Sequence, residues 1–191
     1  MAPEHSRKTG QRAATSARTG TSARTGTSAV YLHFDDIQSL IVAVADRRFG
    51  ELVQLQDDAR TRSADPCQRV RAGCLAYCEF GLTHQGHYQV MFANPLPMPA
   101  DMTPDQFPGR KAFQQLIATV ADCIGADPED QQAFFTAQLT WQQLHGIVSL
   151  RISRPRFPWP PLAETVTEAV DRLLVDARPA SKSGTRGPRR R

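Results

Sequence analysis

Apolar side chains recur at three- and four-residue steps along most of the chain between residues 37 and 177. This spacing places them on one face of an α-helix, where another helix can cover them. No stretch of useful length alternates apolar and polar residues, which is the pattern of a half-buried strand. The sequence therefore predicts an all-α fold, in which helices bury their apolar faces against one another.

Capping and turn residues divide this region into separate helices. Asp35 and Asp36 suit a first turn because their carboxylates can accept its free backbone amides. Asp65 followed by Pro66 is the preferred order of an N-cap and a first-turn proline, and Gly125 ends a later helix. The expected helices span residues 37–60, 66–84, 109–125, 129–151 and 162–177, with one or two further turns over residues 87–93.

Two proline-rich stretches interrupt the helices. NPLPMPADMTPDQFPG, residues 94–109, contains five prolines and is expected to form a loop over the surface or over the mouth of a pocket. RPRFPWPP, residues 154–161, is expected to form a stiff connection to the last helix. Between them, residues 129–151 carry apolar side chains on two faces, which indicates a helix enclosed from two sides.

The two ends of the chain are basic, whereas its middle is acidic. Residues 1–29 hold five basic residues and one acidic residue, residues 178–191 hold five arginines and one lysine, and residues 30–177 hold 12 basic and 18 acidic residues. The repeat TSARTG near the N-terminus supplies no large apolar side chain, so we expect both ends to be disordered. Such tails can bind nucleic acid by neutralising phosphates, although solvated ends are the simpler interpretation.

The four cysteines, Cys67, Cys74, Cys78 and Cys123, lack the regular spacing of a disulfide framework. We expect all four to be reduced, buried side chains of apolar character. No run reaches the roughly 18 apolar residues of a membrane-spanning helix, and the N-terminus has no apolar core of a secretory signal. The expected location is the cytoplasm, without membrane contact.

Residues with metal-binding or catalytic chemistry form no clear site in the sequence. Cys74 and Cys78 lie four residues apart and His84 and His87 three apart, a set that could in principle bind zinc. Two cysteines on an apolar helix face are more often packing residues. The chain has no Gly-x-Ser-x-Gly elbow, phosphate-binding glycine loop or His-Glu-x-x-His helix. We therefore expect no metal, no cofactor and no enzymatic activity.

Two motifs, in this order, resemble parts of TetR-type transcriptional regulators. The box VYLHF, residues 30–34, and the following DDIQSLIVAVADRRFGEL resemble the end of the DNA-recognition helix and the helix that connects it to the body. AYCEFGLTHQGHYQVMFANP and LTWQQLHGIVSL are similar to the ligand-binding body of the subgroup named for its Trp-His-Gly residues, here Trp141, His145 and Gly146. The resemblance covers roughly residues 27–177.

The resemblance implies a TetR-like helical bundle that forms a homodimer and binds a palindromic DNA operator and a small hydrophobic ligand. DNA contacts are then expected from Thr27, Ser28, Tyr31 and His33. The ligand pocket, or the core around it, is expected to include Tyr77, Phe80, Met91, Phe92, Phe113, Trp141 and His145. The dimer interface is expected to include Leu139, Gly146, Leu150, Val166, Val170 and Leu173.

The DNA-binding head is expected to be incomplete. A helix-turn-helix head takes roughly 45 residues, whereas 29 precede Val30 and show neither supporting helix pattern. Ile37 also stands where the family commonly carries a lysine that touches phosphate. Tyr31 and His33 either contact DNA phosphate or take part in packing, and His145 is either a polar group of the pocket or a hydrogen-bonded residue between helices.

The expected organisation has four parts. Residues 1–26 form a disordered basic segment, 27–49 the remnant of the head with the start of the connecting helix, 50–177 the ligand-binding and dimerisation domain, and 178–191 a disordered basic tail. Two functions stay open. One is a DNA-binding repressor that responds to a small hydrophobic ligand. The other is a dimeric ligand-binding or interaction module that has lost specific DNA binding through N-terminal truncation or a misplaced start.

Overall fold

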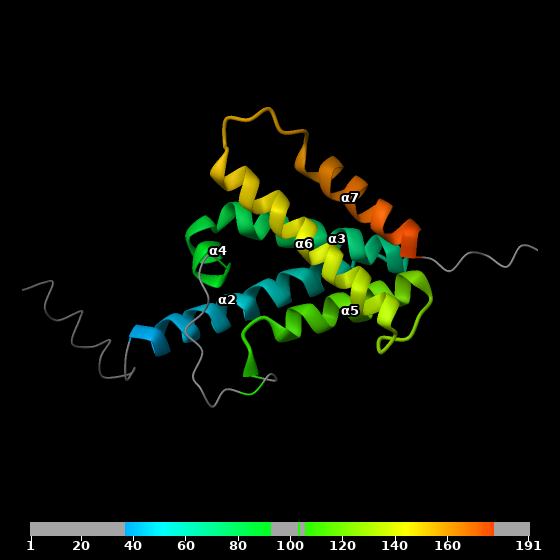
Figure 1. Cartoon of the computed structure of the whole chain (residues 1–191), viewed down its shortest axis with the longest axis horizontal. Helices are drawn as coiled ribbons and strands as arrows, with labels where there is room; N and C mark the ends of the chain where they lie inside the picture. Colours follow the sequence, from blue (N-terminus) through cyan, green and yellow to red (C-terminus); the bar gives the residue numbers. More distant parts are fainter. Residues whose placement is uncertain (1–36, 93–102, 104–105, 178–191) are drawn as a thin grey trace, which may run out of the picture. The chain divides into compact units, whose positions relative to one another are not determined.

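The computed structural model describes residues 37–92, 103 and 106–177, and the elements that run through these ranges are α-helices (Figure 1). The chain divides into two compact units, Met1–Ile37 and Gln38–Arg191, and every contact given below lies in the second. The all-α prediction is confirmed. None of the described helices is both long and apolar enough to cross a membrane. The helices are α2 (Ile37–Arg60), α3 (Pro66–Thr83), α4 (Gln85–Phe92), α5 (Arg110–Ile124), α6 (Gln131–Ser153) and α7 (Leu162–Ala177).

The helix bounds follow from the capping residues. Asp65 accepts a hydrogen bond from the backbone N–H three residues later at 2.9 Å, and Pro66 opens α3. Asp130 accepts one from the backbone N–H two residues later at 2.6 Å, at the start of α6. Gly125 ends α5 in the left-handed conformation, with φ at 73°. The bounds expected from the sequence agree with the described helices within two residues.

Helix α3 lies at the centre of the body. It packs against α5, α6 and α7, and α4 folds back beside it. In Figure 1, α2 and α5 lie on one side of α6, and α7 lies on the other. Most of these helices bring an apolar stripe to a common core. The largest fully buried side chains of this core are Leu52, Val70, Cys74, Cys78, Val120, Thr140, Val148, Val166 and Val170.

Helix α6 is covered on only one of its two apolar sides by the described part of its own chain. Ala137, Leu144 and Val148 are buried against α3 and the neighbouring helices. Phe135 and Leu150 belong to the second stripe, and each is more than half exposed. The second enclosing side that the sequence predicts is therefore not supplied by the described residues of the same chain.

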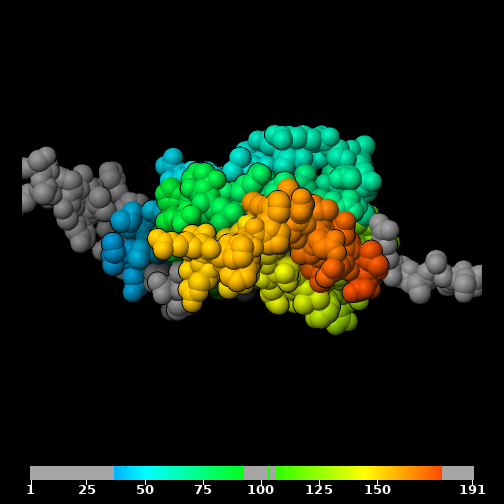
Figure 2. Space-filling view, turned by 90° about the horizontal axis from the view of Figure 1, so that it is seen from above, coloured from blue at the N-terminus to red at the C-terminus, as the bar shows by residue number. Residues whose placement is uncertain are grey.

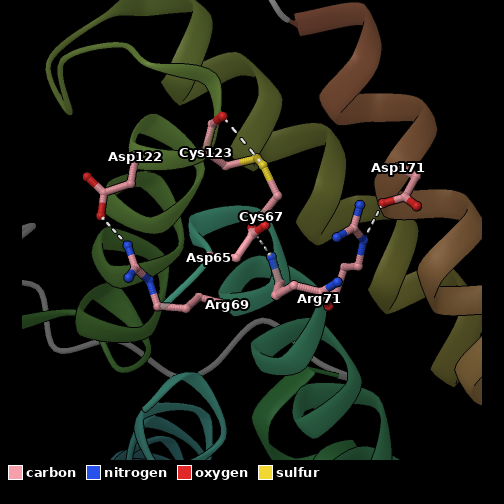
Figure 3. Close-up of a disulfide and its surroundings, with 8 residues drawn as sticks. Asp65, Cys67, Arg69, Arg71, Asp122, Cys123 and Asp171 are labelled. Atoms are coloured by element: carbon pink, nitrogen blue, oxygen red, sulfur yellow. Dashed lines mark hydrogen bonds and ion pairs between the residues drawn. A yellow bond between two sulfur atoms is a disulfide. The ribbon is translucent and has the colours of Figure 1, made fainter. Parts of the chain in front are cut away.

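Cys67 and Cys123 form a disulfide, so the prediction that all four cysteines are reduced is wrong for this pair (Figure 3). Packing of α3 on α5 brings the first turn of one helix to the last turn of the other, with the two Cα atoms 4.8 Å apart. An ion pair between Arg69 and Asp122, at 3.2 Å, joins the same two helices beside it. The pairing escaped the sequence analysis because 56 residues separate the two cysteines.

Cys74 and Cys78 are free and buried, as the sequence predicts for this pair. Burial raises the pKa of Cys74 to about 12, and it also raises the pKa of Cys78. Both side chains therefore stay as neutral thiols, which are poor nucleophiles and poor metal ligands. In the described part of the chain, no group of three or more His, Cys, Asp or Glu side chains could hold a metal ion.

The disulfide is expected to stabilise the fold by restricting the unfolded chain. A cross-link between residues 56 positions apart removes enough chain entropy for about 4 kcal/mol. Cys123→Ser should therefore lower the free energy of unfolding by about this amount in urea denaturation under oxidising conditions.

A reducing agent should bring the wild-type protein to the stability of the variant and leave the variant unchanged. Equal stability of the oxidised and reduced wild-type protein would contradict this account of the cross-link.

Candidate ligand cavity

A cavity of about 220 Å³ lies among helices α2 to α6, close to the end of the proline-rich segment. Its lining is almost entirely apolar, and five of the side chains are aromatic. Each of the five helices contributes at least one of them. The lining residues are Phe49, Leu52, Gln56, Tyr77, Phe92, Pro108, Gly109, Arg110, Ala112, Phe113, Leu116, Trp141 and Leu144.

Aromatic rings from α2, α4, α5 and α6 follow one another around the wall. The ring centroids of Phe49 and Phe92 lie 5.3 Å apart, with the planes inclined by 84°. Phe92 lies 6.5 Å from Trp141, and Trp141 lies 5.7 Å from Phe113. The Phe49–Phe92 contact is edge to face, which is favourable because the positive edge of one ring meets the negative face of the other. The other two pairs are tilted, with the planes inclined by 51°. The rings thus support one another while their remaining faces and edges border the cavity.

Gly109 allows the start of α5 to approach α2. Its φ is 85°, in the left-handed region that glycine adopts at little cost. A Cβ atom at this position would lie 2.6 Å from the ring of Phe49. The prediction of a loop near a pocket mouth applies to residues 94–109, of which 103 and 106–109 are described. Pro108 and Gly109 of this stretch line the cavity.

Polar contacts fix the C-terminal part of α2. The side-chain N–H of Gln56 donates to the carbonyl oxygen of Gly73 in α3 at 3.2 Å. One turn on, Arg60 donates to the carboxylate of Asp57 at 2.9 Å, and Gln115 of α5 donates to the same carboxylate at 3.0 Å. Burial lowers the pKa of Arg60, while the adjacent Asp57 carboxylate opposes the shift. These bonds attach one end of α2 to α3 and α5.

A chain of hydrogen bonds leads from the cavity wall to α6. The hydroxyl groups of Tyr77 and Tyr88 lie 2.9 Å apart, and the Tyr88 hydroxyl lies 2.7 Å from Nδ1 of His145. Burial raises the pKa of Tyr77, and it raises the pKa of Tyr88 to about 12. Burial lowers the pKa of His145, which favours a neutral ring that can share a proton with Tyr88.

A family model described as "Tetracyclin repressor-like, C-terminal domain" matches residues 70–177. The chain belongs to this family. The matched region contains α4 to α7 and most of α3, and therefore all of the cavity wall except the residues of α2.

Beyond the family match, the fold has a counterpart among solved structures. A protein with unknown function from Rhodococcus sp. RHA1 is similar to this member of the tetracyclin-repressor-like family, with 23% sequence identity and a TM-score of 0.65. The similarity covers 80% of each chain. At this identity it supports the fold alone. None of the curated proteins matches the chain.

The structure brings together four of the seven residues predicted for the pocket or its core. Tyr77, Phe92, Phe113 and Trp141 line the cavity. Phe80 and Met91 are buried in the surrounding core. His145 contacts the wall through its hydrogen bond to Tyr88 and through the ring of Phe92, with the centroids 5.2 Å apart. The wall also contains residues that were not predicted for the pocket, namely Phe49, Leu52, Gln56, Leu116 and Leu144. Phe49 and Leu52 lie in the apolar stripe of the connecting helix, which was interpreted as core.

The residues predicted for the dimer interface fall into two groups. Val166 and Val170 are each 1% exposed and pack inside the protomer, so their side chains face the core of their own chain. Leu150 is 52% exposed, and Leu139, Gly146 and Leu173 are partly exposed. A Cβ on Gly146 would meet nothing within 4 Å. The four residues predicted to contact DNA, Thr27, Ser28, Tyr31 and His33, lie outside the described residues.

The close approach of Gly109 to Phe49 predicts a measurable difference between two glycines. Gly109 and Gly125 both have positive φ, but a Cβ on Gly125 would meet nothing within 4 Å. Gly125→Ala should lower the free energy of unfolding by about 1–2 kcal/mol through backbone strain alone. Gly109→Ala should lower the free energy of unfolding by about 1–3 kcal/mol more than Gly125→Ala does, because the ring of Phe49 must move. Urea denaturation of both variants measures the difference, and equal losses would refute the steric role of Phe49.

Proposed function

We propose that the protein is a transcriptional repressor whose DNA binding, in the cytoplasm, responds to a small hydrophobic molecule held in the aromatic cavity. The observation that carries the proposal is the composition of the cavity wall. Phe49 and Leu52 of α2 line it together with side chains of the tetracyclin-repressor-like body. Helix α2 is the element that connects this body to the N-terminal residues. An occupant of the cavity would therefore touch both this connecting helix and the body.

Helix α2 is suited to move in response to an occupant. Its backbone keeps a greater distance from the other helices than α3, α5, α6 and α7 keep from one another. Its C-terminal part is fixed by the bonds of Gln56, Asp57 and Arg60, whereas Phe49 is held at the cavity by packing against Phe92 and Gly109. A ligand would shift the position of α2 only by binding one position more tightly than another. The contacts of an occupant with the aromatic wall would depend on the position of Phe49, which is part of that wall.

The proposed dimer uses the uncovered side of α6 together with α7. Figure 2 shows the α6–α7 side of the body turned to the viewer. Leu150 offers an exposed apolar side chain there, and Gly146 leaves room for the backbone of a second helix. Leu139 and Leu173 are partly exposed on the same two helices. Pairing of two copies would cover the second apolar stripe of α6 and would present two N-terminal segments to a palindromic operator.

Disruption of this surface should separate the protomers without unfolding them. Leu150→Glu places two carboxylates in the proposed interface of the dimer, where they would be desolvated. We expect sedimentation velocity to show a predominantly monomeric species, with unchanged helical circular dichroism. The matched control is Leu55→Glu, which replaces a leucine of α2 that is 44% exposed. A monomeric wild-type protein, or equal effects of the two variants, would contradict the proposed interface.

Specific DNA binding is the second test of this function. In gel shifts, the full chain should bind a fragment flanking its own gene about 10³-fold more tightly than a scrambled fragment of equal length. Combined Tyr31→Ala and His33→Ala should reduce this preference, because both side chains are proposed to hold the reading segment against phosphate. Arg189→Ala with Arg190→Ala in the basic tail should weaken both complexes equally. Equal, salt-sensitive binding of the two fragments by the wild-type protein would refute operator recognition.

The exposure of Ile37 favours a second candidate function. Its side chain is 60% exposed at the start of α2. Because isoleucine is uncharged, this accessible position offers no charge to a phosphate. A dimeric ligand-binding or interaction module without specific DNA binding would carry the same body and the same cavity. For such a module, the gel shifts would show no preference between fragments, while the dimer would remain.

A further inference from the structure

We propose that the cavity selects a flat, neutral, mainly apolar molecule of one or two rings that carries one hydrogen-bond donor for Oε1 of Gln56. The donor would be a hydroxyl or an N–H group. The inference rests on the proposed function in one respect, namely that the cavity holds a ligand. It goes further by naming the chemical class of that ligand and the residue that recognises it.

The size of the cavity limits the occupant. Its volume is about 220 Å³, which is below the roughly 300–1,000 Å³ of pockets for drug-sized ligands. An apolar cavity of about 150 Å³ is known to hold a single benzene ring. The present cavity therefore has room for one ring with substituents or for two fused rings. Long acyl chains and larger polycyclic molecules would extend beyond it.

The shape and polarity of the wall favour a flat aromatic body. Phe49, Phe92, Trp141 and Phe113 succeed one another around the cavity with inclined ring planes. A planar molecule can meet some of these rings face to face and others at their edges, both of which are favourable geometries. Arg110 adds a positive charge to the lining, which disfavours a cationic occupant such as a protonated amine.

Gln56 supplies the one polar group of the lining with an unmet hydrogen-bonding requirement in the described structure. The residue is 5% exposed, and its Oε1 has no hydrogen-bond partner among the described residues. The orientation of the amide is determined by Gly73, whose carbonyl oxygen can only accept and so must face the Nε2 group. Oε1 is therefore the amide atom without a hydrogen-bond partner among the described residues. A buried acceptor without a partner is costly. The oxygen has less than 1 Å² of accessible surface, so a donor on the ligand would remove that cost once the side chain turns slightly toward the cavity.

The hydroxyl group of Tyr77, another polar group of the wall, already has a hydrogen-bond partner. Tyr77 lines the cavity, but its hydroxyl lies at hydrogen-bond distance from Tyr88, which in turn contacts His145. A ligand that used Tyr77 would have to compete with this chain of bonds. Gln56 offers an acceptor without such competition, which is why the inference specifies a donor on the ligand.

Equilibrium dialysis of the full chain against three probes tests the inference. The probes are 2-naphthol, which has a donor, 2-methoxynaphthalene, which has only an acceptor, and naphthalene, which has neither. We expect the wild-type protein to bind 2-naphthol about ten-fold more tightly than the other two, because only 2-naphthol satisfies Oε1 of Gln56. Equal affinity for the three probes, or no binding of 2-naphthol, would overturn the inference.

Two variants identify the residue responsible. Gln56→Met keeps the length of the side chain and removes the acceptor, so it should abolish the preference for 2-naphthol while naphthalene still binds. Gln54→Met makes the same change on the exposed side of α2, where Gln54 bonds to Asp58, and should keep the ten-fold preference. A preference that persists in Gln56→Met would overturn the role of Gln56. Thermal unfolding of both variants without probe verifies that they are folded.

The outcome is separate from that of the DNA-binding tests. Dialysis measures the affinity of the protein for the probes in the absence of DNA. The probe preference can therefore be confirmed even if the gel shifts show no operator recognition. In that case, the proposed repressor function would be refuted and the proposed ligand class would be supported. Conversely, specific DNA binding with no discrimination among the probes would support the repressor and refute the ligand class.

Discussion

The enclosure of α3 by three other helices is the constraint on which the rest of the structure depends. Val70, Cys74 and Cys78 are fully buried along this helix, so it has to be covered by α5, α6 and α7. At Gly81 a Cβ atom would lie 2.7 Å from Val148 of α6 and 2.8 Å from Tyr88 of α4. The missing side chain thus allows both neighbours to approach. Because burial of this apolar surface supplies most of the folding free energy, the positions of α4 to α7 follow from it.

This arrangement leaves α2 with a different role. The fully buried side chains between the central helices are small or branched, whereas the space beneath α2 is bordered by the large rings of Phe49, Phe92, Phe113 and Trp141. These inclined rings border a space that no other described side chain fills. The cavity can therefore be understood as the place where a tightly packed bundle meets a more loosely attached helix. The C-terminal part of α2 is held by the bonds of Gln56, Asp57 and Arg60, and Leu52 joins the helix to the common core.

Much of the fold, and part of the cavity, could be predicted from the sequence. Apolar spacing and the caps at Asp65 and Asp130 are local signals, which is why the helix bounds agree so closely with the structure. Tyr77 and Trp141 were found because they are aromatic within matched motifs. Other features depend on which helices meet. The Cys67–Cys123 disulfide, the approach of Gly109 to Phe49 and the unpartnered oxygen of Gln56 exist only in the folded chain.

Helix α6 shows why an apolar stripe does not by itself reveal its partner. Val166 and Val170 of α7 have the spacing of an interface, and the structure buries them inside the protomer. On α6, by contrast, Trp141 lines the cavity, His145 bonds to Tyr88, and Gly146 stands clear of every side chain of the described protomer. Three nearby positions on one helix thus border the cavity, the Tyr88 hydroxyl behind its wall and the open surface, respectively. Along α6, the cavity wall and the proposed dimer surface are therefore separated by little more than one helical turn.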